Sequence, residues 1–353
     1  MGKSVPSRPS VRNLQAIKGG SYTITLPRWW VLKQRLRKGS KLFMSEDGAA
    51  LKIVARDVIG KRRKVEIDLD KLGNMRSVRY AIWTYYMQGA DEIVVMSSEP
   101  LAADRKRQLR EVRMDLPGID IAREDDRTVV FIVSEQQEEK KLDDMITSLH
   151  NVALTIHRDA VKALVEGNVE AAAEVVSREP EVLRIYRSII RHIAQCSMNP
   201  ETAYRSGVSN TRELLTYAVF ARDLSRLIYH AMYVARHFNR YGRKIEDKDM
   251  LRLIETLSEQ VYRMQSLAVE SFLEKNFNKV LQVTDMMVKV KGLEESINVR
   301  TLQSVGDVNK AVTLMMIVRE MRRMAGHCVA IADIAANRML APDEEVMLVR
   351  TNV

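Results

Sequence analysis

The sequence predicts a multidomain α+β protein with a β-rich module at the N-terminus, a small α/β sandwich as a connector and an all-α bundle at the C-terminus. Three observations support this fold class. Short runs of β-branched and aromatic residues, separated by Gly and Pro, fill residues 11–57. Strand-like and helix-like segments alternate over residues 60–133. From residue 134 onward, Pro and Gly become sparse and the apolar residues follow the 3.6-residue period of helices.

The positive charge of the chain is concentrated at its N-terminus. The 353 residues carry a formal net charge of +10, yet residues 1–64 hold 16 Lys and Arg against 3 acidic residues, a net of +13, which leaves −3 for the remainder. This asymmetry favours an acidic partner for the N-terminal module, with nucleic acid first and an anionic membrane surface second.

We expect a cytoplasmic protein without membrane insertion. The first residues lack the apolar stretch of a signal peptide, and no apolar run approaches the ~18–20 residues of a membrane span. Cys196 and Cys328 lie far apart in apolar helical patterns, which is typical of free thiols in a reducing compartment.

Two hairpins and a short helix make up the predicted N-terminal module. Gly19-Gly20 supplies the turn of the first hairpin, and the second hairpin turns at Asp47-Gly48. Between them Pro27 begins a short helix that runs to Gln34, because the missing N–H of proline has no partner in a first turn. A unit of about 45 residues has too small a core to stand alone, so we expect the module to dimerise or to dock on another surface.

The run from Gly20 to Trp30, followed by Leu36-Arg37-Lys38-Gly39-Ser40 and the Asp47-Gly48 turn, resembles the AbrB/SpoVT (swapped-hairpin) DNA-binding domain. The resemblance implies a homodimer whose intertwined hairpins form a small β-barrel that binds DNA. Trp29 and Trp30 are expected to pack in the core and the dimer rather than to stack on bases. The matching DNA-binding positions are Arg12, Lys18 and Arg28, with Lys33, Arg35, Arg37 and Lys38 as flanking phosphate contacts.

The second segment predicts a connector without a nucleotide site. It contains no Walker-type or dinucleotide-type glycine pattern. We therefore assign it the role of joining the N-terminal module to the helical part. The predicted strands are 65–69, 92–97, 118–123 and 128–133, and the predicted helices are 76–88 and 100–115.

The helical part contains an internal repeat, which indicates two similar three-helix units in tandem. Residues 160–169 align with 268–277 at an offset of 108, and residues 222–231 align with 319–328 at an offset of 97. Pro180 is expected to kink the second helix or to delay its start. The predicted domains are 1–58, 59–133, 134–240 and 241–345.

The repeats resemble the PhoU family, regulators of phosphate uptake that are built from two tandem three-helix bundles. An archaeal subset of this family carries an AbrB-like domain and an α/β connector, so the resemblance covers nearly the whole chain. In the family, carboxylates four residues apart on the second and third helix of each unit share a helix face and hold a metal cluster.

This sequence departs from the metal motifs at all four places. One carboxylate of eight remains, and Arg322 and Lys291 place cations where a metal needs anions. We therefore expect no family-type metal cluster and no other cofactor. The four pairs become Glu179 with Leu183, Ser225 with Tyr229, Met287 with Lys291 and Arg322 with Gly326.

Two histidines occupy equivalent positions of the repeats, and each follows an arginine by four residues. The pairs are Arg226 with His230 and Arg323 with His327. One interpretation is structural, with hydrogen bonds between helices satisfying these side chains. The other is a pocket for a small anion such as phosphate.

The leading hypothesis is a DNA-binding transcriptional regulator of the PhoU-like type, linked to phosphate uptake or homeostasis. One alternative is a dimeric adaptor that does not bind DNA and docks a phosphate transporter subunit or a sensor kinase. Another is an architectural protein that binds DNA with little sequence preference. An enzyme is not expected, because the sequence shows no nucleophile with a base, no loop that cradles phosphates and no intact metal dyad.

Overall fold

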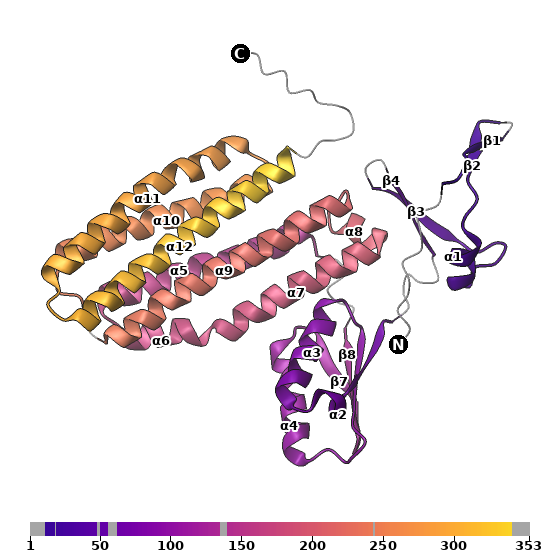
Figure 1. Cartoon of the computed structure of the whole chain (residues 1–353), viewed down its shortest axis with the longest axis horizontal. Coiled ribbons are helices and arrows are strands. Elements are labelled where there is room, and N and C mark those ends of the chain that lie inside the picture. The colour runs from indigo at the N-terminus through magenta and orange to yellow at the C-terminus, as the bar shows by residue number, and fades with distance from the viewer. Residues whose placement is uncertain are drawn as a thin grey trace. The chain divides into compact units, whose positions relative to one another are not determined.

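A computed structural model describes residues 11–17, 19–47, 50–55, 62–134, 140–242 and 244–340. The chain divides into two compact units, one with Met1–Ser45 and Leu51–Lys61 and the other with Glu46–Ala50 and Arg62–Val353. The small N-terminal sheets and the C-terminal helical bundle confirm the coarse fold class (Figure 1). The finer division into four domains remains a prediction.

The N-terminal unit has the predicted order of hairpin, short helix and hairpin. Strand β1 (Gln15–Ile17) pairs antiparallel with β2 (Ser21–Thr23). Gly19 and Gly20 between them have φ angles of 112° and 90°, which glycine adopts without a steric penalty. Pro27 occupies the N-cap position of helix α1 (Arg28–Lys33), and β3 (Leu42–Asp47) pairs with β4 (Ala50–Ala55).

The described residues of this unit form two separate two-stranded sheets and no closed barrel. The barrel implied by the resemblance is therefore not a feature of the described part of a single chain. Of the described residues between 11 and 55, Ala55 is the one that is buried. The described part of one copy thus has almost no core of its own.

The connector is a four-stranded sheet in the order β5-β6-β8-β7. Strands β5 (Lys64–Asp68) and β6 (Glu92–Met96) are parallel, so they need a crossover, which α2 (Leu69–Leu72) and α3 (Met75–Met87) supply. Strands β7 (Ile119–Glu124) and β8 (Thr128–Val133) complete the sheet with antiparallel pairings.

The core of the connector lies between its sheet and its helices. Helices α3 and α4 (Ala103–Glu111) lie along the sheet, and α4 continues into a short 3-10 turn at Val112–Asp115 (Figure 1). Ile82 and Tyr86 of α3 pack with Ile93 and Phe131 of the strands, and all four are fully buried.

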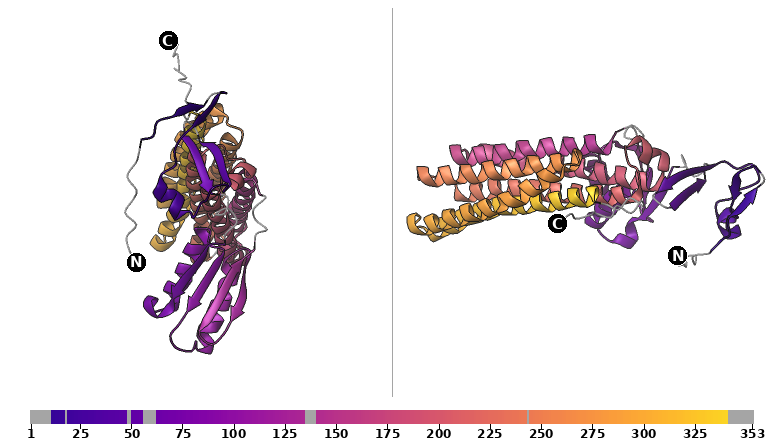
Figure 2. Two further views of the ribbon diagram at one scale, coloured as in Figure 1. Left: turned by 90° about the vertical axis from the view of Figure 1, so that its right-hand side faces the viewer. Right: turned by 90° about the horizontal axis from the view of Figure 1, so that it is seen from above.

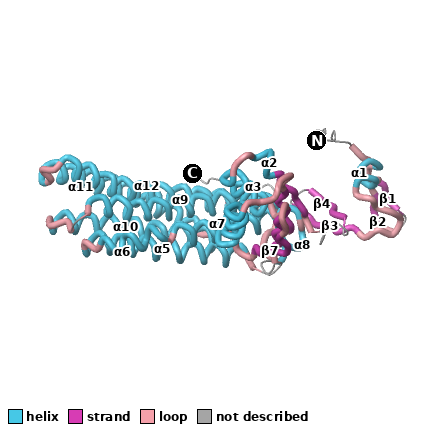
Figure 3. Tube along the Cα trace, turned by 90° about the horizontal axis from the view of Figure 1, so that it is seen from below, coloured by secondary structure: helices cyan, strands magenta, loops and turns pink. Residues whose placement is uncertain are grey.

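The helical part is built from long helices that run side by side (Figures 2 and 3). One continuous hydrophobic core joins the two repeats. None of the helices in the described ranges combines the length and the apolar character that crossing a bilayer requires. The helices are α5 (Leu142–Glu166), α6 (Val169–Ser177), α7 (Glu179–Met198), α8 (Pro200–Arg205), α9 (Thr211–Tyr241), α10 (Lys248–Leu273), α11 (Phe277–Ser304) and α12 (Val308–Met339).

The first repeat differs from the prediction of three helices. Its second helix is split at Arg178 into α6 and α7, and Pro180 stands in the first turn of α7. Proline lacks the N–H that an uninterrupted helix would use there, so it delays the start of α7 as expected. The additional helix α8 begins at Pro200 behind an Asn199 cap.

Candidate functional site

The basic residues expected to contact DNA lie on the surface of the N-terminal unit. Six of the seven are described, and none of the six forms an ion pair within the described ranges. Lys18, the seventh, lies outside the described residues. Among the described residues, no carboxylate therefore offsets the positive charge of this surface. The six exposed residues are Arg12, Arg28, Lys33, Arg35, Arg37 and Lys38.

A sharp turn at the end of α1 groups several of these cations. Arg35 has a φ of 55°, in the left-handed region that side-chain-bearing residues seldom adopt. Its N–H donates to the carbonyl of Leu32 at 3.0 Å, and the N–H of Leu36 donates to the carbonyl of Val31 at 3.0 Å. These bonds end the helix. Five of the seven cations expected to contact DNA lie on α1 or directly after it.

Helices α9 and α12 exchange two histidine–carboxylate contacts. His230 Nδ1 lies 2.5 Å from Glu320 Oε2, and His327 Nδ1 lies 3.0 Å from Asp223 Oδ1. The two imidazole rings stack with centroids 5.2 Å apart. Asp223 and Glu320 are also 97 residues apart. The contact is therefore reciprocal between equivalent positions of the two repeats.

These contacts favour the structural interpretation of the histidines over the anion pocket. Glu320 is 5% exposed and also accepts a hydrogen bond from Arg323 at 3.1 Å. Burial alone would raise the pKa of Glu320, but the hydrogen bond and charge of His230 and the charge of Arg323 lower it. Two carboxylates beside the imidazoles would repel an anion. Arg226, the fourth residue of the expected pocket, is exposed on α9.

The positions of the degenerate metal motifs carry side chains with other surroundings in the structure. In the described part of the chain, no group of three or more His, Cys, Asp or Glu is placed to hold a metal ion. Ser225 is buried, and burial raises the pKa of the half-buried Tyr229. Arg322 pairs with Glu294 at 3.5 Å.

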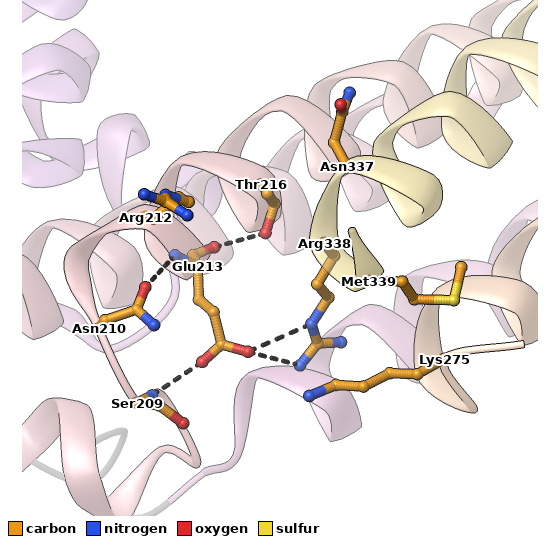
Figure 4. A pocket seen from close by; sticks show the side chains of 9 residues that line it. All are labelled: Ser209, Asn210, Arg212, Glu213, Thr216, Lys275, Asn337, Arg338 and Met339. Carbon is orange, nitrogen blue, oxygen red and sulfur yellow. Dashed lines mark hydrogen bonds and ion pairs between the residues drawn. The ribbon is translucent and has the colours of Figure 1, made fainter. Parts of the chain in front are cut away.

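A polar pocket of about 450 Å³ lies where α9 begins, α10 leads into α11, and α12 ends (Figure 4). Glu213 of α9 spans it to meet Arg338 of α12, whose Nε and Nη2 both lie 3.4 Å from Glu213 Oε1. The other carboxylate oxygen accepts the N–H of Ser209 at 2.8 Å. The lining residues are Ser209, Asn210, Arg212, Glu213, Thr216, Lys275, Asn337, Arg338 and Met339.

Arg338 anchors the floor of this pocket. Its side chain is 5% exposed and donates to the hydroxyl of Tyr217 at 2.9 Å and to the carbonyl of Phe272 at 3.1 Å. The Tyr217 hydroxyl donates in turn to Asp143 at 2.5 Å, and burial and this carboxylate raise the pKa of Tyr217. The network joins both repeats, and the sequence motifs did not predict it.

Two arginines of α7 reach into the connector. Arg191 donates to the carbonyls of Tyr86 at 3.1 Å and Ala90 at 2.5 Å, and to Asp91 at 2.9 Å. Arg187 lies over the ring of Trp83 at 4.0 Å. Both arginines are buried, so they connect the α/β sheet domain to the first repeat. Their signal in the sequence was a pair of cations four residues apart on the apolar side of a helix.

Two segments of the chain, residues 146–238 and 254–335, match the family model of the PhoU domain. They coincide with the two helical repeats. The helical part of the chain is PhoU-like. The matched segments begin within α5 and end within α12. The PhoU relation therefore concerns the helical part.

Two solved structures resemble this PhoU-like protein. The crystal structure of PhoU from Pseudomonas aeruginosa has 16% sequence identity and a TM-score of 0.49, and the match covers 56% of this chain and 94% of that one. The crystal structure of the phosphate transport system regulatory protein PhoU from Streptococcus pneumoniae has 13% identity and a TM-score of 0.50, with 57% and 95% covered. At 13% identity, the likeness to the Streptococcus pneumoniae structure shows that the helical part shares its fold. No curated protein matches the sequence.

Proposed function

We propose that this PhoU-like protein is a regulator of phosphate homeostasis that binds DNA through its N-terminal unit. The PhoU relation of the helical repeats supports the link to phosphate. The observation that carries the DNA-binding part is the set of six exposed cations without carboxylate partners among the described residues, within a segment of net charge +13. Phosphate groups of a duplex attract such a surface at any sequence, and they set its affinity.

The apolar surface of the N-terminal unit supports a homodimer. Trp29 is 49% exposed and Leu32 is 64% exposed in the single chain. Ile17, Tyr22 and Ile24 are each at least half exposed, and burying apolar side chains of this kind is favourable. A second copy of the unit would bury these side chains and place two sets of cations on one duplex.

Duplex binding by the full chain, followed by fluorescence anisotropy as salt is raised, tests the proposal. We expect binding at about 50 mM salt that weakens steeply as salt rises, because each neutralised phosphate releases counterions. Arg28→Gln and Lys33→Gln should each reduce the slope of log affinity against log salt by about 1.

The matched control removes one exposed cation from the connector. Arg123 lies on β7, so Arg123→Gln makes the same change of charge outside the proposed interface. Its slope should equal that of the unchanged protein. If the protein shows no duplex affinity at about 50 mM salt, binding through α1 is excluded. The same holds if Arg28→Gln, Lys33→Gln and Arg123→Gln all reduce the duplex affinity equally.

The adaptor hypothesis also has an observation in its favour. Helices α11 and α12 expose apolar side chains, with Val288 at 76% and Leu302 at 69%. Exposed apolar side chains on these helices would be available to a protein partner. An adaptor would bind a phosphate transporter subunit or a sensor kinase and show no duplex affinity. Genome-wide mapping of bound DNA separates the remaining cases, since a regulator gives discrete peaks and an architectural protein gives diffuse coverage.

A further inference from the structure

Beyond its first turn, α9 exposes its side chains along one line of the helix. Residues three or four positions apart share a helix face, and the line follows this spacing from residue 215 to residue 240. Its last six members, which we call the arginine–tyrosine stripe, span about 27 Å at 1.5 Å per residue. They are Arg222, Arg226, Tyr229, Tyr233, Arg236 and Arg240.

The charges of α9 are distributed unequally around the helix. The helix contains five arginines, no lysine and two acidic residues. Both carboxylates meet partners on α12, since Glu213 lies 3.4 Å from Arg338 and Asp223 lies 3.0 Å from His327. The acidic groups of α9 are therefore engaged in contacts between the repeats.

Three of the four arginines of the stripe lack a carboxylate partner. Arg222, Arg226 and Arg240 form no ion pair within the described ranges. Nη2 of the fourth, Arg236, lies 3.3 Å from Oε2 of Glu179 on α7. Among the described residues, one carboxylate thus pairs with a stripe of four cations.

Phenol rings lie among these guanidinium groups. Tyr233 is 37% exposed, and the guanidinium of Arg236 lies 4.8 Å from its ring centroid. Burial raises the pKa of the half-buried Tyr229, although the charges of Arg187 and Arg226 act against this rise. The hydroxyl of Tyr229 therefore stays protonated at neutral pH and can donate a hydrogen bond.

The second repeat lacks the equivalent of this stripe. At the offset of 97 residues, its positions in α12 keep the first two arginines and lose the last four members. Tyr229, Tyr233, Arg236 and Arg240 correspond to Gly326, Ala330, Asp333 and Asn337. The packing of a repeat therefore does not require the stripe, which is a feature of α9 alone.

The composition of the stripe fits a nucleic-acid strand. Guanidinium groups bind phosphate through paired hydrogen bonds, and aromatic side chains stack on unpaired bases. A strand carries a phosphate at every nucleotide, so a straight row of arginines can contact it at several points whatever its sequence. An acidic peptide would need carboxylates at matching positions, and a duplex keeps its bases paired.

We propose that the arginine–tyrosine stripe of α9 binds single-stranded nucleic acid, with its arginines on phosphates and Tyr233 against a base. The proposal does not depend on duplex binding by the N-terminal unit. It assigns a second nucleic-acid surface to the helical part, whose net charge is otherwise close to zero.

Fluorescence anisotropy of the full chain with a labelled oligothymidylate of about 15 nucleotides, at several salt concentrations, tests the proposal. Arg222→Gln and Arg226→Gln should each make the slope of log affinity against log salt less steep by about 0.7, because each loses one phosphate contact. Tyr233→Leu should weaken binding about fivefold or more without changing the slope, the effect of losing one stacked base. Tyr233→Phe keeps the ring and should bind as the unchanged protein does.

The matched control is Arg263→Gln on α10. Arg263 is exposed, lies outside the stripe and forms no ion pair within the described ranges. Its slope should equal that of the unchanged protein. The cations of the N-terminal unit also attract a single strand, but all these variants retain them. The difference between the stripe variants and Arg263→Gln therefore reports on α9.

Each result decides for or against the stripe. A less steep slope in both arginine variants, together with weaker binding by Tyr233→Leu, supports the proposal. Slopes equal to that of Arg263→Gln overturn it, as does equal binding by Tyr233→Leu and Tyr233→Phe. A melting temperature measured for each variant shows whether its fold is intact.

Two further probes test the kind of partner. A duplex of the same length whose slope falls as much in Arg226→Gln would overturn the assignment to single strands. Poly-L-glutamate of equal charge that binds more tightly than oligothymidylate, and loses affinity in Arg226→Gln, would assign the stripe to an acidic protein instead. Weaker binding of both probes, unchanged in Arg226→Gln, is the result we expect.

Discussion

Glu320 shows how a single buried carboxylate stabilises the contact between the two repeats. It accepts hydrogen bonds from His230 of α9 and from Arg323 of its own helix, and its pKa is lowered in the folded protein. A carboxylate with a lowered pKa stabilises the fold above its unfolded pKa of about 4.3. This contribution disappears as the pH falls through the lower folded value.

We expect Glu320→Gln to reduce the free energy of unfolding by about 2 kcal/mol at neutral pH, because two cationic or polar partners lose their acceptor charge. At about pH 3.5 the loss should be smaller, since the native carboxylate is then partly protonated. Urea denaturation at both pH values measures the difference. Asp223→Asn, at the more exposed of the two pairs, should have a smaller effect. A loss for Glu320→Gln that does not change with pH would contradict this role of the charge.

The sequence predicted part of this cluster. The repeat offset placed His230 and His327 at equivalent positions, and the structure stacks their rings. Their partners could not be predicted, because Asp223 and Glu320 each belong to the opposite repeat and meet their histidines only when α9 packs on α12. The pair Glu213 and Arg338 was missed for the same reason, since 125 residues separate them.

At the scale of elements, α7 fastens the connector to the bundle through Arg191. We expect Arg191→Met to reduce the free energy of unfolding by about 3 kcal/mol, because Asp91 and two buried carbonyls lose their donor. Arg184→Met is the matched control on the same helix. Arg184 is exposed, so its change should stay within about 0.5 kcal/mol. Thermal and urea denaturation measure both variants, and equal stabilities would show that Arg191 does not hold the interface.

Gly167, at the end of α5, provides a second prediction at this scale. Its φ is 73°, and a Cβ there would lie 2.6 Å from Cβ of Lys244. We expect Gly167→Ala to destabilise the protein by about 1–2 kcal/mol, through backbone strain and this close approach. Gly292, within α11, has no atom within 4 Å of an added Cβ, so Gly292→Ala should stabilise by about 1 kcal/mol. Melting temperatures that shift in the same direction for both variants would contradict the argument.

The elements themselves were well predicted by local chemistry. The glycine turn of the first hairpin, the proline before α1 and the split between α6 and α7 at Arg178, just before Pro180, follow from backbone preferences within a few residues. The docking of α7 on α3 depends on surfaces that form only after both elements fold. The sequence analysis did not predict these contacts, because the partners of Arg187 and Arg191 are distant in the chain.

At the scale of the whole molecule, the distribution of charge separates two parts of different character. Most of the net +13 of residues 1–64 falls on a unit with almost no buried side chain among its described residues, and the near-neutral remainder of the chain includes the PhoU-like repeats with their continuous core. Charge counting therefore predicted which part carries the excess of cations, whereas the 3.6-residue period of the apolar residues predicted the bundle. It could not predict how the N-terminal unit gains a core, because a dimer interface involves a second copy of the chain.

Leu32→Glu tests that interface. Leu32 is 64% exposed in the single chain, so the change would have little effect on a monomer, whereas in a dimer it would bury a charge in an apolar contact. We expect Leu32→Glu to convert a dimer to a monomer in analytical ultracentrifugation and to weaken duplex binding. Leu215→Glu on α9 is the matched control, because Leu215 is 65% exposed and lies on the bundle. If both variants keep the mass of the unchanged protein, the N-terminal unit does not dimerise through the surface around α1.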